Sequence, residues 1–170
     1  MVFPAPSRLL PYVALLCLTF GLTLGGILAR PIESLSLFWP VNAVLAGVLL
    51  RHPRQATLAG FSLVWLAMVG ADLLCGSAWG PALWFNLCNL AVVVTLWQLL
   101  SRLPRLHRRM RTPHGVLSVF AACAAAAMVA ASMAAVMAAP WFEQSLRATW
   151  LAWFSEQFSI SVLVLPVLLP

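Results

Sequence analysis

Six long apolar runs occupy most of the 170-residue chain, and they restrict the folds open to it. The runs cover residues 9–29, 35–50, 56–74, 82–101, 115–139 and 148–169. A helix needs about 20 apolar residues to cross the hydrocarbon core of a bilayer. Because 63% of the residues are hydrophobic and only 8% are charged, an ordinary soluble domain is excluded. The sequence predicts an all-α integral membrane protein, a polytopic bundle of about six transmembrane helices.

The arginines predict how this bundle is oriented, because cytoplasmic loops hold an excess of Lys and Arg. With a cytoplasmic N-terminus, Arg30 and Arg147 fall in outer loops, near Glu33 and Glu143. The remaining arginines fall on the inner side: Arg8, Arg51, Arg54, Arg102, Arg105, Arg108, Arg109 and Arg111. Six spans then place the C-terminus in the cytoplasm as well. The basic loop 101–112 has no interleaved aromatic residues, so its expected partner is the lipid bilayer and not a nucleic acid.

Polar side chains inside the spans are the first candidates for function, since burying them in lipid is costly. On this orientation they share one depth, in the outer half: Asn42, Asp72, Asn86, Asn89, Glu156 and Gln157. We expect a polar cluster that opens toward the outer face. Glu156 is its expected principal determinant, because no Lys or Arg lies within a span to neutralise it, and it could respond to pH or to a cationic ligand. The alternative is that these groups only join helices through hydrogen bonds.

Helical spacing predicts which faces meet protein. Asn86 and Asn89 share one face. A second stripe of small and polar residues comprises Ala152, Ser155, Glu156 and Ser159. Most tryptophans, Trp39 included, fall near the outer ends of spans and suggest an interfacial belt. Trp84 and Trp153 are close in sequence to Asn86 and Glu156, so they are expected to line the pocket.

Other residues predict packing more than chemistry. Gly21 and Gly25 form a G-x-x-x-G pattern, and residues 120–139 contain twelve alanines, so both segments are expected to approach neighbours closely. Pro40 begins the second span and Pro166 lies late in the sixth, where a kink or early unwinding is expected. The chain has no recognisable catalytic motif and its cysteines are isolated, so we expect no catalytic residue, no cofactor and no metal site.

Three stretches resemble the first type of bacterial membrane-associated sensor (MASE) domain. Phe38-Trp39-Pro40-Val41-Asn42-Ala43, followed by the basic turn 51–54, is similar to the tryptophan-proline motif of that family. Residues 86–102 look like its Asn-rich helix ending in arginines. Residues 150–166 look like its closing signature, with Trp153, Ser155, Glu156 and Pro166.

The resemblance implies an N-terminal sensory module of a bacterial inner (plasma) membrane protein. Members of the family regulate cytoplasmic diguanylate cyclase, phosphodiesterase or histidine kinase domains that follow in the same chain. Residues 1–170 would then be one membrane-embedded sensor domain without an enzyme activity of its own. Family domains tend to have about eight spans, so six suggest a truncated or short form.

Two other functions fit the same residues. A small transporter or permease component would use the carboxylates to carry a proton or a cationic substrate. An assembly module would use its small-residue faces to pair protomers, for instance as a homodimer, and its polar residues would only specify packing.

Overall fold

The computed structural model describes residues 9–29, 39–142 and 145–170, and within these ranges all regular elements are helical. The long helices are α1 (Leu10–Leu28), α4 (Trp79–Ser101), α6 (Pro113–Phe142) and α7 (Leu146–Leu168). The shorter ones are α2 (Val41–Arg51), η1 (Pro53–Gln55), α3 (Leu58–Leu74) and α5 (Arg105–Arg108). The all-α prediction is therefore confirmed for the described part of the chain.

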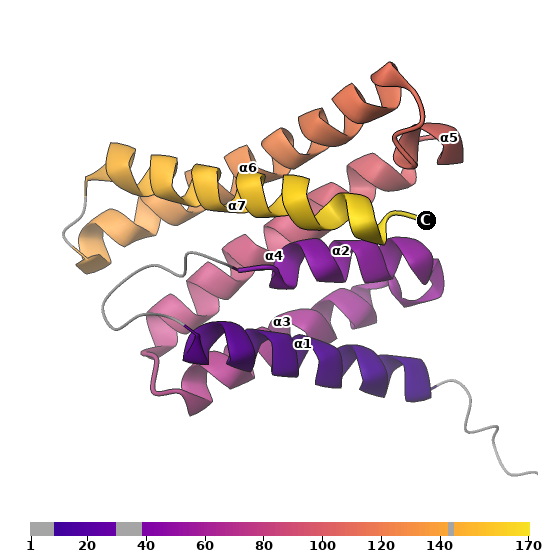
Figure 1. Cartoon of the computed structure of the whole chain (residues 1–170). Helices are drawn as coiled ribbons and strands as arrows, with labels where there is room; N and C mark the ends of the chain where they lie inside the picture. The colour runs from indigo at the N-terminus through magenta and orange to yellow at the C-terminus, as the bar shows by residue number, and fades with distance from the viewer. Residues whose placement is uncertain (1–8, 30–38, 143–144) are drawn as a thin grey trace, which may run out of the picture.

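The bundle is built from three pairs of helices stacked on one another (Figure 1). α1 packs against α3, α2 packs against α4, and α6 packs against α7. The middle pair joins the outer two, because α2 contacts α1 and α7 while α4 contacts α3 and α6. These six helices alternate in direction along the chain, and α5 lies at the same end of the bundle as the last residue (Figure 1).

Within the described ranges, four helices are long and apolar enough to cross a membrane: α1, α4, α6 and α7. α3 has 17 residues and α2 only 11, about 16 Å at 1.5 Å per residue, which is roughly half of a hydrocarbon core. The expected second span began at residue 35, but residues 35–38 lie outside the described residues, as do Arg8, Arg30, Glu33 and Glu143. The remaining arginines that were expected on the inner side are all described, and they lie at one end of the bundle, here called the arginine end. They are Arg51, Arg54, Arg102, Arg105, Arg108, Arg109 and Arg111.

α2 is the enclosed helix of the bundle. Eight of its 11 residues are buried, and the six that carry apolar side chains belong to cores shared with α1, α3, α4, α6 and α7. Trp39, just before the helix, is 3% exposed, so it is a core residue and not part of an interfacial belt. Its ring lies against Gly26 of α1, where an added Cβ would come within 2.7 Å of it. Because Trp39 fills this space, Gly26 is the glycine that α1 needs for packing.

The G-x-x-x-G pattern of α1 does not mediate packing between the described helices. A Cβ added at Gly21 or Gly25 would meet nothing within 4 Å, and both residues are exposed. The alanine-rich segment behaves as expected, since Ala126, Ala130 and Ala134 are fully buried between α6 and its neighbours α4 and α7. Small side chains let helix backbones approach closely, so α6 gains many contacts along its length.

Candidate functional site

Buried amide side chains from three helices meet beside the first turn of α2. The Nδ2 group of Asn42 donates two hydrogen bonds, one to Oδ1 of Asn89 on α4 and one to Oε1 of Gln157 on α7, both 2.9 Å long. Pro40 precedes α2 and fixes its own φ near the helical value, which sets where the helix starts and therefore where Asn42 lies. Asn42 thus joins α2 to both α4 and α7.

The hydrogen bonds continue along α4 to the end of α3. Nδ2 of Asn89 donates to Oδ1 of Asn86, one helical turn earlier, at 3.4 Å. Nδ2 of Asn86 donates to Oδ2 of Asp72 at 2.5 Å and to the carbonyl of Ala82 at 2.8 Å. The other carboxyl oxygen of Asp72 accepts from the hydroxyl of Ser77 at 3.3 Å. We call the set Gln157, Asn42, Asn89, Asn86 and Asp72 the amide network.

The amide network is buried, which corrects the expectation of a cluster that opens outward. The exposed fractions are 0% for Asn86, 1% for Asn42, 3% for Gln157, 6% for Asn89 and 8% for Asp72. Asn89 and Gln157 lie near the middle of two 23-residue helices, while Asp72 lies near the end of α3 that is farther from the arginine end. Oδ1 of Asn42 is buried and accepts no hydrogen bond from the described residues, so the centre of the network retains an unused acceptor.

On α7 the buried face differs from the predicted one. The side chains of Ser155 and Ser159 are exposed on the surface of the bundle, and Glu156 is only partly buried. The residues that face the bundle are Thr149, Trp153, Gln157, Ile160, Ser161 and Leu165. Gln157, which follows Glu156 in the sequence, is buried on this face and bonds to Asn42. The four-residue spacing of Thr149, Trp153, Gln157 and Ser161 was the available sequence signal, since it places them on one helical face.

Trp84 and Trp153 lie in a separate aromatic cluster between α4, α6 and α7. Trp84 donates from its indole nitrogen to the carbonyl of Met133 on α6, at 3.0 Å. Trp153 is 8% exposed, packs against Cys88, and stacks on Phe85 with ring centroids 5.5 Å apart. The two tryptophans fix the positions of α6 and α7 relative to α4. The structure therefore places them in this packing cluster, while it joins Asn42, Asn86, Asn89 and Asp72 through hydrogen bonds.

α2 contacts α7 at two further points toward the arginine end. A Cβ added at Gly47 would lie 2.6 Å from Cβ of Leu168, so the two backbones approach as closely as glycine allows. Nε of Arg51 donates to the carbonyl of Leu168 at 2.7 Å. That carbonyl is at the C-terminus of α7, where helical carbonyls lack partners within the helix and the helix dipole favours a cation. Three contacts along α2, at Asn42, Gly47 and Arg51, therefore hold α7.

Comparison with known proteins gives one informative similarity. No protein-family model matches the chain, and no solved structure matches it. Over 169 residues, 99% of this chain, it is 32% identical to a protein described as a probable diguanylate cyclase, DgcF, of Escherichia coli O157:H7. The chain spans 36% of that protein's length. Its apolar helical bundle is thus similar to about one third of a relative that is described as a cyclase.

Proposed function

We propose that the chain is the membrane-embedded input module of a bacterial signalling protein that regulates a cytoplasmic diguanylate cyclase. Its expected partners are the bilayer of the inner membrane and an output domain in the same protein, with the arginine end in the cytoplasm. Two findings support this assignment: four helices can span a membrane, and nearly the whole chain is similar to part of DgcF. The similarity to the sensor family in the Trp39-Pro40 motif agrees with it.

The amide network is the observation on which the proposal rests. Interhelical hydrogen bonds of this kind contribute only about 0.6–2 kcal/mol each in membranes. Such bonds are strong enough to define one arrangement of helices and weak enough to be exchanged for another. Because the network ends on Gln157 of α7, a change at Asp72 or Asn86 reaches α7 through two helices. α7 would then carry the change to its C-terminus at the arginine end.

In this mechanism a stimulus acts by favouring one of two bundle arrangements. It must interact with the two arrangements with different affinity, since equal affinity shifts no equilibrium. The unused Oδ1 acceptor of Asn42 is a point where a hydrogen-bond donor would stabilise one arrangement over the other. Glu156, on the adjoining face of α7, and Ser155 would sense the surroundings of the helix. No residue of the module needs to perform catalysis, which we assign to the output domain.

The decisive experiment compares Gln157→Leu with Gln98→Leu in the full-length protein. Gln157 is in the network, whereas Gln98 is an exposed amide on α4, so the two variants make the same chemical change in different surroundings. Synthesis of cyclic di-GMP from GTP is measured in membrane vesicles. A shift of about 1 kcal/mol between two arrangements changes their ratio roughly fivefold. We therefore expect Gln157→Leu to change the rate of synthesis several-fold and Gln98→Leu to leave it near the wild-type value.

A second network variant shows whether the effect of Gln157→Leu comes from the amide network or from a general folding defect. Asn89→Leu removes the adjacent link, so it should change the synthesis rate in the same direction as Gln157→Leu, and the double variant should show less than the sum of the two effects. Unchanged synthesis in folded Gln157→Leu and Asn89→Leu proteins would refute the proposal. Saturable uptake of a cation or proton by proteoliposomes that Asp72→Asn abolishes would favour the transporter alternative.

A further inference from the structure

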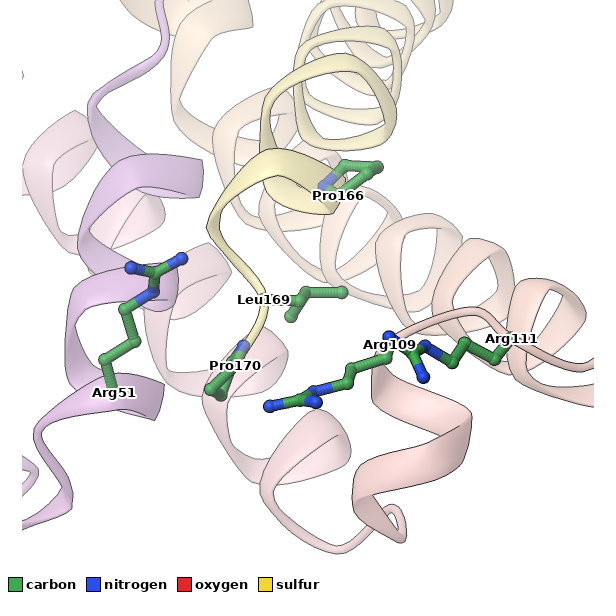
Figure 2. Close-up of a pocket in the computed structure, with 6 residues that line it drawn as sticks. All are labelled: Arg51, Arg109, Arg111, Pro166, Leu169 and Pro170. Atoms are coloured by element: carbon green, nitrogen blue, oxygen red, sulfur yellow. The ribbon is translucent and has the colours of Figure 1, made fainter.

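A cavity of about 520 Å³ opens at the arginine end, beside the C-terminus of α7. Its walls come from three elements: the end of α2, the α5–α6 connection and the end of α7 (Figure 2). The lining residues are Arg51, Arg109, Arg111, Pro166, Leu169 and Pro170. In Figure 2, Arg51 lies on one side of the segment 169–170, and Arg109 extends toward Pro170 from the other side.

The charge of this cavity is strongly one-sided. Three of its six lining residues are arginines, and none of the six has a carboxyl side chain. The Nε atom of Arg51 is engaged by the carbonyl of Leu168, so its charge is held at the rim of the cavity. Guanidinium groups recognise phosphate through paired hydrogen bonds as well as charge. The cavity therefore has the chemistry of a site for a phosphate ester.

The backbone conformation between Arg109 and Arg111 directs both side chains outward. Met110 has a φ of 51°, in the left-handed region that a side chain rarely adopts. Its own side chain packs against the core formed by α2, α4, α6 and α7. Arg109 and Arg111, on either side of it, are exposed and line the cavity. The connection is also tightly packed, because a Cβ added at Gly115 would lie 2.5 Å from the carbonyl oxygen of His107. The arginines are thus positioned by a fixed turn.

We propose that this cavity binds the phosphate group of an anionic phospholipid at the cytoplasmic surface of the membrane. This inference rests on the orientation given under the proposed function: the ends of α4, α6 and α7 at the arginine end would meet the lipid head groups, so the cavity would lie at the depth of their phosphate esters. A bound phosphate would contact α7 at its C-terminal end, whereas the amide network contacts Gln157 near the middle of the same helix. The composition of the inner leaflet would then affect the same helix that the network holds. The site shares no residue with the network.

The test measures lipid binding by the full-length protein, so its outcome does not depend on the stimulus or on cyclase activity. The wild-type protein is incorporated into nanodiscs of phosphatidylcholine with or without phosphatidylglycerol, and retained lipid is counted by native mass spectrometry. The double variant Arg109→Gln/Arg111→Gln is compared with Arg102→Gln/Arg105→Gln, which removes the same charge from the same loop outside the cavity. We expect the first variant to lose affinity for phosphatidylglycerol about fivefold or more per arginine, and the second to keep it.

A second experiment, with soluble phosphates, distinguishes a lipid phosphate from a soluble phosphate ligand. Glycerol 3-phosphate and inorganic phosphate are titrated onto protein in phosphatidylcholine nanodiscs. Saturable binding that requires Arg109 and Arg111 would support the phosphate site but assign it to a soluble ligand, which would overturn the lipid assignment. Equal losses of phosphatidylglycerol from both double variants would overturn the site itself, since they would show attraction by general charge. Thermal unfolding of both variants confirms that each is folded, and Arg109→Lys/Arg111→Lys should recover only part of the affinity because lysine lacks the planar fork.

Discussion

The two ends of α2 hold α7 in opposite ways. At its start, Asn42 bonds to Gln157 within the core, where both side chains are at most 3% exposed. At its end, Arg51 is exposed and reaches across the surface to a backbone carbonyl of α7. Neutral amides can be buried because each satisfies another, whereas a guanidinium loses too much hydration energy unless it stays near water. One short helix thus couples the interior of the bundle to its charged surface.

The contact of Asn42 in the core should contribute more to the stability of the bundle than the contact of Arg51 at the surface. Asn42→Leu would leave Oδ1 of Asn89 and Oε1 of Gln157 without their shared donor, and buried unpaired acceptors are costly. We expect the free energy of unfolding to fall by about 1–3 kcal/mol. Steric trapping in bicelles or reversible unfolding in SDS would measure it. Gln98→Leu is the matched control and should change the value by less than about 0.5 kcal/mol. Similar values for both variants would show that the network does not stabilise the bundle.

The middle of α2 gives the next largest expected effect. In Gly47→Ala the new methyl group would overlap Leu168, so α2 and α7 must separate slightly. Overpacking costs about 1–3 kcal/mol, partly offset by up to about 1 kcal/mol from the better helix propensity of alanine. The net loss should be about 1 kcal/mol. Gly70→Ala on α3 is the control, since nothing lies within 4 Å of its added Cβ, and it should be neutral or stabilising. A stabilising Gly47→Ala would contradict the close approach of α2 and α7.

The surface contact should have the smallest effect on stability and a local effect on motion. Arg51→Met removes the donor of the hydrogen bond to Leu168 and keeps an unbranched side chain, and we expect this to cost less than about 1 kcal/mol. A spin label at Val167, which is 78% exposed, should become more mobile because the last turn of α7 loses its capping partner. Arg54→Met makes the same change at an arginine of the same turn that does not make this bond, and it should leave the label unchanged. If both variants increase mobility equally, charge and not the hydrogen bond holds the end of α7.

Much of the fold could be predicted from local sequence patterns, that is, from residues that are close together along the chain. Runs of apolar residues predicted six transmembrane spans. Helices lie at all six positions, but among the described residues only α1, α4, α6 and α7 are long and apolar enough to cross a membrane. The depth of Asn42, Asp72, Asn86 and Asn89 along their helices predicted that these residues would gather, and they are joined by hydrogen bonds. Glu156 was predicted to be the principal residue of the site for a different reason, namely its charge and not its position on the helix. A carboxylate is unusual in a span, but an unusual residue does not reveal which side of its helix faces the bundle.

The sequence by itself determined that this chain forms apolar helices, and it predicted which ends of them carry charge, because hydrophobicity and charge act through composition and periodicity alone. Only the tertiary structure decided that α2 is enclosed and that Gln157 joins the network. It also selected Gly26 in place of Gly21 and Gly25 as the packing glycine of α1. These outcomes depend on the rotation of each helix about its axis. That rotation is set by side-chain fit between helices distant in sequence, such as Trp39 on Gly26 and Leu168 on Gly47.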